Sequence, residues 1–321
     1  MSVFHRIDPE YLPVFAVAPR IDLTDIAGAR RALHAIFALM GPAGSDPDVE
    51  RSDLVAPGPA GEPDIVMRMH RPRGVTGPLP CLFWIQGGGY VLTSVDPDDL
   101  LCQSLSRDLQ CVVIAVVWRR APEHPFPACH DDCYGGLRWV VQNAESLDID
   151  PARVVVGGAS SGGGAAAGVA LRVRDEGEFA IAHQVLVYPM LDDRNETRSS
   201  HSVTDPELWN RQCNEIAWAA YLGGAQTVSH YAAPARATTL ERLAPATILT
   251  AELDLFVDEN IDYAKRLMAA NVPVELHVYP AVHHGFDIHN PQAATSMRFA
   301  ADRNAVLRRA FATPVPTKDQ S

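Results

Sequence analysis

Seven apolar, β-rich runs recur along the chain, with stretches of helical spacing between them and an eighth candidate run nearer the N-terminus. The clearest run, 112–118, is apolar at every position, which is typical of a strand buried on both faces. Strands that alternate with helices favour a largely parallel sheet with helices on both faces. The runs are residues 49–55, 65–70, 82–85, 112–118, 154–156, 184–187, 247–250 and 275–279. The chain is therefore predicted to be an α/β protein that binds ligands beyond the carboxyl ends of its strands.

The hydrophobic content, the net charge and the lack of long apolar segments limit the kinds of protein that this chain can be. With 47% hydrophobic residues, the 321-residue chain is long enough for a large domain with a substantial core. The formal net charge of −12 argues against a nucleic acid or an anionic membrane as the main partner. The N-terminus lacks the apolar stretch of a signal peptide, and no segment reaches the roughly 18 apolar residues of a membrane span. A cytoplasmic location is expected.

Six cysteines are expected to remain free thiols in a chain of this size. Cys129 and Cys133 lie within about one helical turn, with a histidine and two aspartates between them. This spacing matches no standard zinc pattern, and the sequence contains no second pair of ligands that would complete a zinc site. The segment is predicted to start a helix with two buried thiols. Neither a metal nor an organic cofactor is expected.

Residues 156–164 read Val-Gly-Gly-Ala-Ser-Ser-Gly-Gly-Gly, between a β-branched run and a small-residue stretch of helical character. Gly158 and Gly162 lie two residues on either side of Ser160, whereas Ser161 lacks this spacing. In the Gly-x-Ser-x-Gly pattern, the glycines let a strand and a helix approach closely while the serine takes a strained backbone conformation. The sequence therefore predicts a nucleophilic serine at a sharp strand-to-helix turn.

A serine hydroxyl needs a base to take its proton, and the base needs a carboxylate to orient it. Acidic residues follow the predicted strand 247–250, and histidines follow the predicted strand 275–279. Both groups lie just past strand carboxyl ends, as a shared active site requires. The residues alone leave three candidate acids and two candidate bases: Glu252, Asp254, Asp258, His283 and His284.

A second glycine-rich turn, 86–90 (Gln-Gly-Gly-Gly-Tyr), follows directly on the predicted strand 82–85. Backbone N–H groups unobstructed by side chains suit an oxyanion that forms during acyl transfer. A phosphate-cradling loop is the alternative, but neither Lys-Ser/Thr nor Gly-x-Gly-x-x-Gly follows the turn. The turn is therefore interpreted as an oxyanion loop, and no nucleotide site is expected.

Two segments fall outside the alternation of strands and helices. Residues 25–40 carry apolar side chains at helical spacing, with Thr24 as the candidate N-cap. Residues 191–224 open with charged side chains and then contain Trp209, Trp218 and Tyr221, which either line a pocket or pack in the core. The chain is predicted to form a single domain, 1–321, with cap elements from about 1–45 and 191–228.

Several separate motifs between about residues 79 and 286 resemble those of the bacterial hormone-sensitive-lipase-like (family IV) carboxylesterases of the α/β-hydrolase fold. Residues 86–89 are similar to that family's His-Gly-Gly-Gly oxyanion loop, with Gln86 in place of the histidine. Residues 158–163 are similar to its Gly-Asp-Ser-Ala-Gly-Gly, with Ala159 and Ser161 as departures. Residues 254–259 and 284–286 resemble its Asp-Pro-Leu-x-Asp-Glu and His-Gly-Phe motifs. The cap segments look more specifically like heroin-esterase-like acetyl esterases.

The resemblance implies a mostly parallel, eight-stranded sheet with helices on both faces and a helical cap. It implies a catalytic triad of Ser160, Asp254 and His284. By the same analogy, the oxyanion donors are the N–H groups of Gly88, Gly89 and Ser161. Tyr90 and Trp209 are expected to contact the substrate.

The activity implied by the resemblance is hydrolysis of short-chain, acetyl-like esters of small molecules through an acyl-enzyme. A lactonase, lyase or acyltransferase with the same triad is the alternative. A second alternative is a receptor without catalytic activity. The plant gibberellin receptors are of this kind: they resemble this family but lack the catalytic histidine. The sequence leaves open whether the chain is a monomer or a homodimer.

Overall fold

The computed structural model describes residues 2–16, 20, 22–40, 44–92, 96–313 and 315. Its centre is an eight-stranded sheet with strand order β1-β2-β4-β3-β5-β6-β7-β8. Strand β2 pairs antiparallel with both of its neighbours, and the remaining pairs are parallel. The strands are β1 (Val49–Ala56), β2 (Ile65–Pro72), β3 (Leu79–Ile85), β4 (Val112–Val117), β5 (Ile149–Ala159), β6 (His183–Val187), β7 (Ala246–Ala251) and β8 (Val274–Tyr279). The predicted α/β class and its mostly parallel sheet are confirmed.

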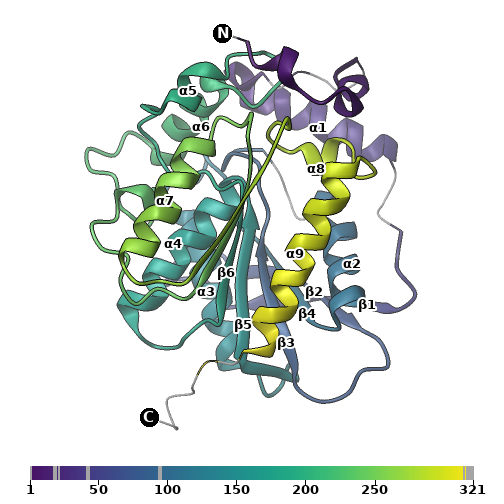
Figure 1. Cartoon of the computed structure of the whole chain (residues 1–321). Coiled ribbons are helices and arrows are strands. Elements are labelled where there is room, and N and C mark those ends of the chain that lie inside the picture. The colour runs from purple at the N-terminus through teal and green to yellow at the C-terminus, as the bar shows by residue number, and fades with distance from the viewer. Residues whose placement is uncertain are drawn as a thin grey trace.

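Helices cover both faces of the sheet (Figure 1). Helices α2 (Asp99–Leu109) and α9 (Ala294–Ala312) pack on one face. The other face carries α3 (Ala128–Gln142), α4 (Ser161–Glu176) and α7 (Val257–Ala269). Every residue of β3 is buried, because a central parallel strand covered on both faces contacts no solvent. Cys129 and Cys133 lie buried in the first turns of α3.

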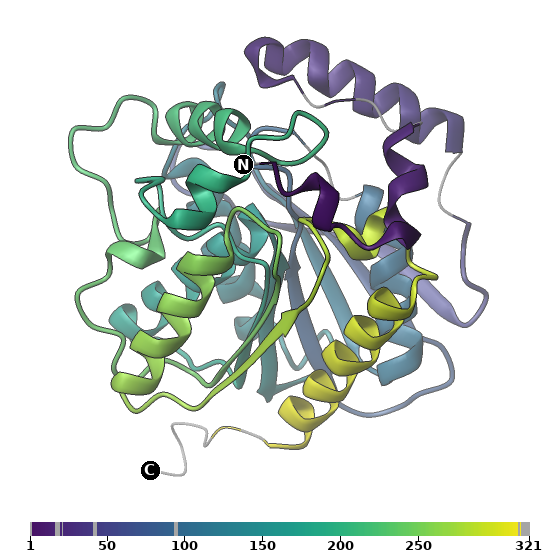
Figure 2. The ribbon, with the colours of Figure 1, turned by 45° about the horizontal axis from the view of Figure 1, so that its top comes forward.

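The remaining helices gather at one end of the sheet, where Figures 1 and 2 show the N-terminal segment lying over the same end as α5 and α6. These helices are α1 (Ile26–Met40), α5 (Arg198–Ser202), α6 (Arg211–Leu222) and α8 (Phe286–His289). Short 3₁₀ turns complete the described elements: Phe4–Arg6, Pro9–Ala16, Leu23–Asp25, Asp96–Asp98 and Pro234–Arg236. Among the described ranges, no helix is both long and apolar enough to cross a membrane.

The predicted N-cap of the first helix is wrong. Thr24 lies inside the 3₁₀ turn that precedes α1, and its N–H donates to the side chain of Asp22 at 2.9 Å. Asp22 therefore caps the 3₁₀ turn, and Asp25, directly before α1, accepts from the N–H of Gly28 at 2.8 Å. Each carboxylate accepts an N–H that a helix start leaves without an acceptor.

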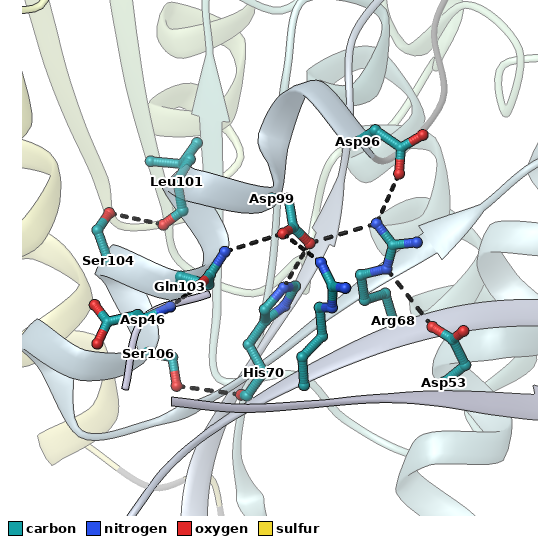
Figure 3. Close-up of polar contacts among 11 residues, drawn as sticks. Asp46, Asp53, Arg68, His70, Asp96, Asp99, Leu101, Gln103, Ser104 and Ser106 are labelled. Carbon is teal, nitrogen blue, oxygen red and sulfur yellow. Dashed lines mark hydrogen bonds and ion pairs between the residues drawn. The ribbon is translucent and has the colours of Figure 1, made fainter. Parts of the chain in front are cut away.

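A buried polar network joins the antiparallel edge of the sheet to the start of α2 (Figure 3). The carboxylate of Asp99 accepts hydrogen bonds from Arg51 at 3.0 Å and Gln103 at 2.9 Å, and lies 3.0 Å from Nε2 of His70. Burial raises the pKa of this carboxyl, but the contacts with His70 and Arg51 outweigh burial and bring the pKa down to about 2. Asp99 is therefore a buried charge whose partners surround it.

Candidate active site

Ser160 sits between the last residue of β5 and the first residue of α4, with φ 58° and ψ −123°. A Cβ added at Gly158 would lie 2.3 Å from the carbonyl oxygen of Gly162, and one at Gly162 would lie 2.0 Å from that of Ile85. Only glycine fits at these two positions, because a real Cβ does not approach backbone so closely. The strand and the helix thus meet across the turn that presents Ser160.

Three of the predicted residues, Ser160, His284 and Asp254, form a chain of hydrogen bonds in the structure. Nε2 of His284 lies 2.9 Å from Oγ of Ser160, and Nδ1 lies 2.6 Å from Oδ2 of Asp254. Asp254 follows β7 and is 1% exposed, and its second oxygen accepts from the N–H of Phe256 at 3.0 Å. His284 follows β8. This geometry lets the imidazole take the serine proton while the buried carboxylate holds its tautomer and orientation.

The other candidate acids and the other candidate base lie elsewhere. Glu252 pairs with Arg6 and accepts from the N–H of Ala281. Asp258 accepts from the N–H of Ser199 at 2.8 Å. The ring of His283 is fully buried, with Nε2 2.7 Å from His289; burial lowers its pKa to about 3. None of the three reaches Ser160 in this arrangement.

The glycine-rich turn after β3 packs against the serine turn. A Cβ at Gly87 would lie 2.8 Å from the carbonyl oxygen of Ala159, and Gly88 and Gly89 take positive φ values of 118° and 59°. In the described part of the chain, the backbone N–H groups of Gly88 and Gly89 donate to no backbone acceptor. Ser161 opens α4, so its N–H also lacks an acceptor within the helix. Such preorganised donors beside a serine suit a developing oxyanion.

Gln86, which stands where the related loops carry histidine, is 2% exposed. Its Oε1 is buried and finds no hydrogen-bond partner among the described residues. The backbone of the loop thus holds its shape without a bond to this oxygen, because the glycine conformations and their packing against β5 already define the turn.

A cavity of about 550 Å³ opens over Ser160 and His284. Its wall is mainly apolar and draws on segments far apart in the sequence, including Leu33, Leu100 and Trp209. The ring of Trp209 covers the oxyanion loop so closely that a Cβ at Gly89 would lie 2.3 Å from it. A mainly apolar cavity with a few convergent polar groups is typical of a small-molecule site.

Tyr90 does not line this cavity. It follows the oxyanion loop in a positive-φ conformation (63°), and its ring is buried against Tyr221, 3.7 Å between ring centroids and nearly parallel. Trp218 packs beside the same pair, 5.7 Å from the Tyr90 ring. The turn therefore aims Tyr90 into the core, and the prediction that it contacts the substrate does not agree with this placement.

Three charged residues that the sequence did not single out line the same cavity: Asp98, Asp287 and Arg303. Asp287 directly follows the His-Gly-Phe segment, which is a signal that could have drawn attention to it. Asp98 precedes α2 and Arg303 lies within α9, where a charged residue ordinarily faces solvent. The packing of α9 on β5, β6 and β7, with α8 against α9, brings Asp287 and Arg303 to this cavity, and the 3₁₀ turn before α2 brings Asp98 there.

The chain matches the alpha/beta hydrolase fold family over residues 82–288 and belongs to that family. Bacterial heroin esterase superposes on it with a TM-score of 0.93 at 40% sequence identity, covering 97% of this chain and 99% of that one. Carboxylic ester hydrolase LipN of Mycobacterium tuberculosis is 36% identical over 271 residues, which is 82% of this chain and 70% of the relative. Ethyl acetate hydrolase of Pseudomonas putida is 33% identical over 255 residues, 74% of this chain and 80% of the relative. The resemblance to the hormone-sensitive-lipase-like esterases and to heroin esterase is thereby confirmed.

Proposed function

We propose that this chain is a serine carboxylesterase that hydrolyses short-chain acyl esters of small molecules, with Ser160, His284 and Asp254 as its triad. The observation that carries the proposal is the row of contacts at 2.9 Å and 2.6 Å through the imidazole of His284. The esterases and ester hydrolases among its relatives support the same reaction class.

The reaction proceeds by acyl transfer. His284 takes the proton of Ser160 as the serine oxygen attacks the ester carbonyl, and the oxyanion accepts hydrogen bonds from backbone N–H groups. As the tetrahedral intermediate collapses, His284 gives its proton to the leaving alcohol and an acyl-enzyme remains. Water then attacks the acyl-enzyme with His284 as base, which releases the acid and restores the serine. Gly88, Gly89 and Ser161 are the proposed oxyanion donors.

The cavity wall supports the proposal of a short acyl group. Trp209 lies over the oxyanion loop, with its ring 6.5 Å from the imidazole of His284 between centroids. Its indole N–H donates to Asn214 at 3.3 Å, which fixes the ring in place. A large, fixed ring beside the carbonyl site favours a short acyl chain, because a longer one would have to displace it.

The lining of the same cavity supports the proposal of a cap. Leu33 of α1 and Trp209 of the segment before α6 line it from the strand carboxyl ends. We propose that residues from about 1–45 and 191–228 form this cap within a single domain, 1–321. A cytoplasmic location and a homodimer stay predictions.

The decisive experiment compares 4-nitrophenyl acetate hydrolysis by the wild type, Ser160→Ala and Ser161→Ala. Loss of the Ser160 hydroxyl should lower kcat/KM roughly 10³-fold or more, because the nucleophile disappears. The neighbouring Ser161→Ala is the matched control: its hydroxyl is buried without a partner among the described residues, and the backbone N–H is kept. It should retain ready hydrolysis. Equal rates for the wild type and Ser160→Ala would refute the assignment.

Lactone opening, lyase chemistry and transfer of the acyl group to an alcohol would use the same residues. Product analysis with water and methanol as competing acceptors separates acyl transfer from hydrolysis. Free acid as the main product at low alcohol concentration is expected for an esterase. A receptor without catalysis would bind ligand tightly and show no turnover, and the presence of His284 argues against it.

A further inference from the structure

The cavity has a charged end. Asp98, Asp287 and Arg303 line it together with Ser160 and come from three separate elements around it. Aromatic side chains lie among them: Trp84, Tyr188 and Phe299. The rest of the wall is mainly apolar, so a bound molecule would place an apolar body near the serine and meet charge only at this end.

Among the described residues, neither carboxylate has a cationic partner in direct contact. Asp98 accepts one hydrogen bond, from the indole N–H of Trp84 at 2.6 Å, and its side chain does not cap α2. Asp287 accepts one, from the hydroxyl of Tyr188 at 2.8 Å. Across the described residues, no lysine, arginine or histidine nitrogen lies within 4.0 Å of either carboxylate. A carboxylate accepts about four hydrogen bonds, so each retains unused acceptor capacity.

The neighbouring Asp99 differs from Asp98 because several hydrogen-bond donors contact its carboxylate. It turns away from the cavity and is held by Arg51, Gln103 and His70 (Figure 3), with its pKa at about 2. Burial instead raises the pKa of Asp98 to about 6, and it also raises that of Asp287. The guanidinium of Arg51 thus lies beside the carboxylate of Asp99, whereas Asp98 has no such cation in contact, and the like charge of Asp287 raises its pKa further.

Arg303 does not supply that cation by direct contact. Its guanidinium donates to Oδ1 of Asn304 at 3.3 Å and lies 5.7 Å from the ring centroid of Phe299. The side chain is 7% exposed, and burial lowers its pKa. Its single positive charge offsets one of the two carboxylates at longer range. With both aspartates ionised, the charged end of the cavity carries one net negative charge.

We propose that this charged end selects esters that carry a protonated amine, with the ammonium group held between Asp98 and Asp287 while the ester carbonyl lies at Ser160. The inference rests on the proposed function and names its substrate class. An ammonium group supplies the hydrogen-bond donors that both carboxylates lack and brings the cluster to neutrality. The aromatic rings around it add cation–π attraction. An anionic ester is disfavoured, because two carboxylates outnumber the one guanidinium.

The test uses two acetate esters of almost the same shape. In 2-(dimethylamino)ethyl acetate the terminal nitrogen is protonated near neutral pH, and in 3-methylbutyl acetate a CH group replaces it. The readout is the ratio of kcat/KM for the cationic ester to kcat/KM for the neutral one. The two substrates share their shape, and the effect of the ammonium group on the intrinsic reactivity of the ester is the same for every variant. A change in the ratio between the wild type and a variant therefore isolates the contribution of the substituted carboxylate.

For the wild type at about pH 7.5, the ratio should exceed one by roughly tenfold, since a desolvated ion pair contributes at least that much. Asp98→Asn and Asp287→Asn should each lower it roughly tenfold. Asparagine keeps the size of the side chain and a carbonyl oxygen that still accepts from Trp84 or Tyr188. The matched control is Asp302→Asn, which removes one negative charge from α9 outside the cavity, where Asp302 accepts from Tyr279. The control should leave the ratio unchanged.

The outcomes separate this inference from the proposed function. Efficient hydrolysis of both esters with a ratio near one would overturn the inference alone. Equal ratios for the cavity variants and Asp302→Asn would do the same. If the wild type turned over neither acetate ester, both the proposed function and this inference would fall. Thermal unfolding of each variant verifies that the substitutions leave the fold intact.

Discussion

Single residues set the geometry of the serine turn. Gly158 and Gly162 let β5 and α4 come together, and the positive φ of Ser160 points its hydroxyl at His284. Ala159 and Ser161 flank the serine where the related family carries other residues. The side chain of Ser161 is fully buried, and Ala159 lines the cavity. Ala159 thus changes the wall of the cavity, and the contacts among Ser160, His284 and Asp254 are kept.

Gly162→Ala should destabilise the protein by roughly 3 kcal/mol or more, because its Cβ would lie 2.0 Å from the backbone oxygen of Ile85. Backbone atoms of a central strand cannot move without disturbing the hydrogen bonds between that strand and its neighbours. The control is Gly44→Ala, since a Cβ there meets nothing within 4 Å. Urea unfolding measures both variants. A Gly162→Ala protein as stable as Gly44→Ala would contradict this account of the turn.

At the scale of elements, Arg30 adds hydrogen bonds to the apolar contacts that hold α1 on the core. The guanidinium of Arg30 donates to the carbonyl oxygens of Val91 and Ala121, both at 2.6 Å, and to the carboxylate of Glu123. Val91 directly follows the oxyanion loop, and Leu33 of the same helix lines the cavity. The position of the helix and the shape of the cavity are thus linked.

Arg30→Gln should therefore loosen α1 and raise KM for ester substrates several-fold, with faster backbone hydrogen exchange across the helix. Arg31→Gln is the matched control, because Arg31 is 74% exposed and lies 3.6 Å from Asp25. Exchange rates and KM that changed equally in the two variants would show that Arg30 does not anchor the helix.

At the scale of the whole molecule, four histidines with lowered pKa values make stability sensitive to acid; His130 and His283 are buried, and His183 and His289 are half-buried. Burial lowers the pKa of His130 and His283 to about 3, and that of His183 and His289 to about 4, from 6.5. These rings are neutral in the folded protein, whereas the unfolded chain binds protons below about pH 6.5. The stability they contribute is complete above that pH and falls as the pH drops toward the folded pKa values.

Each of these histidines should lower the free energy of unfolding by roughly 1 kcal/mol for each pH unit below about pH 6. Unfolding measured between about pH 7 and pH 5 covers this range. His130 provides the cleanest test, because it is 1% exposed and its ring nitrogens have no hydrogen-bond partner among the described residues. His130→Phe should flatten the dependence of the unfolding free energy on pH. The exposed His201→Gln should not, and identical slopes for both would contradict the prediction.

Much of the fold follows from local pattern. The eight predicted runs correspond to the eight strands. The central strand β3 is apolar because it is buried on both faces, whereas the edge strand β1 carries exposed charged residues. The glycine spacing around Ser160 likewise follows from the chain itself, since close approach of backbones excludes any side chain. The N-cap was misassigned because Asp22, Thr24 and Asp25 are all common capping residues, and only the hydrogen bonds show that Asp22 caps the 3₁₀ turn and Asp25 the start of α1.

The tertiary structure alone decided which side chains reach the serine. Local patterns left five candidate acids and bases, and it is the meeting of the loops after β7 and β8 that brings His284 to Ser160 and turns His283 into the core. Tyr90 was expected to contact the substrate but is buried in the core, whereas Asp98 was not singled out from the sequence but lines the cavity. Sequence determines which segments become strands and helices, because hydrophobic period and backbone sterics are local. The direction of a side chain across a cavity depends on packing between segments far apart in the chain.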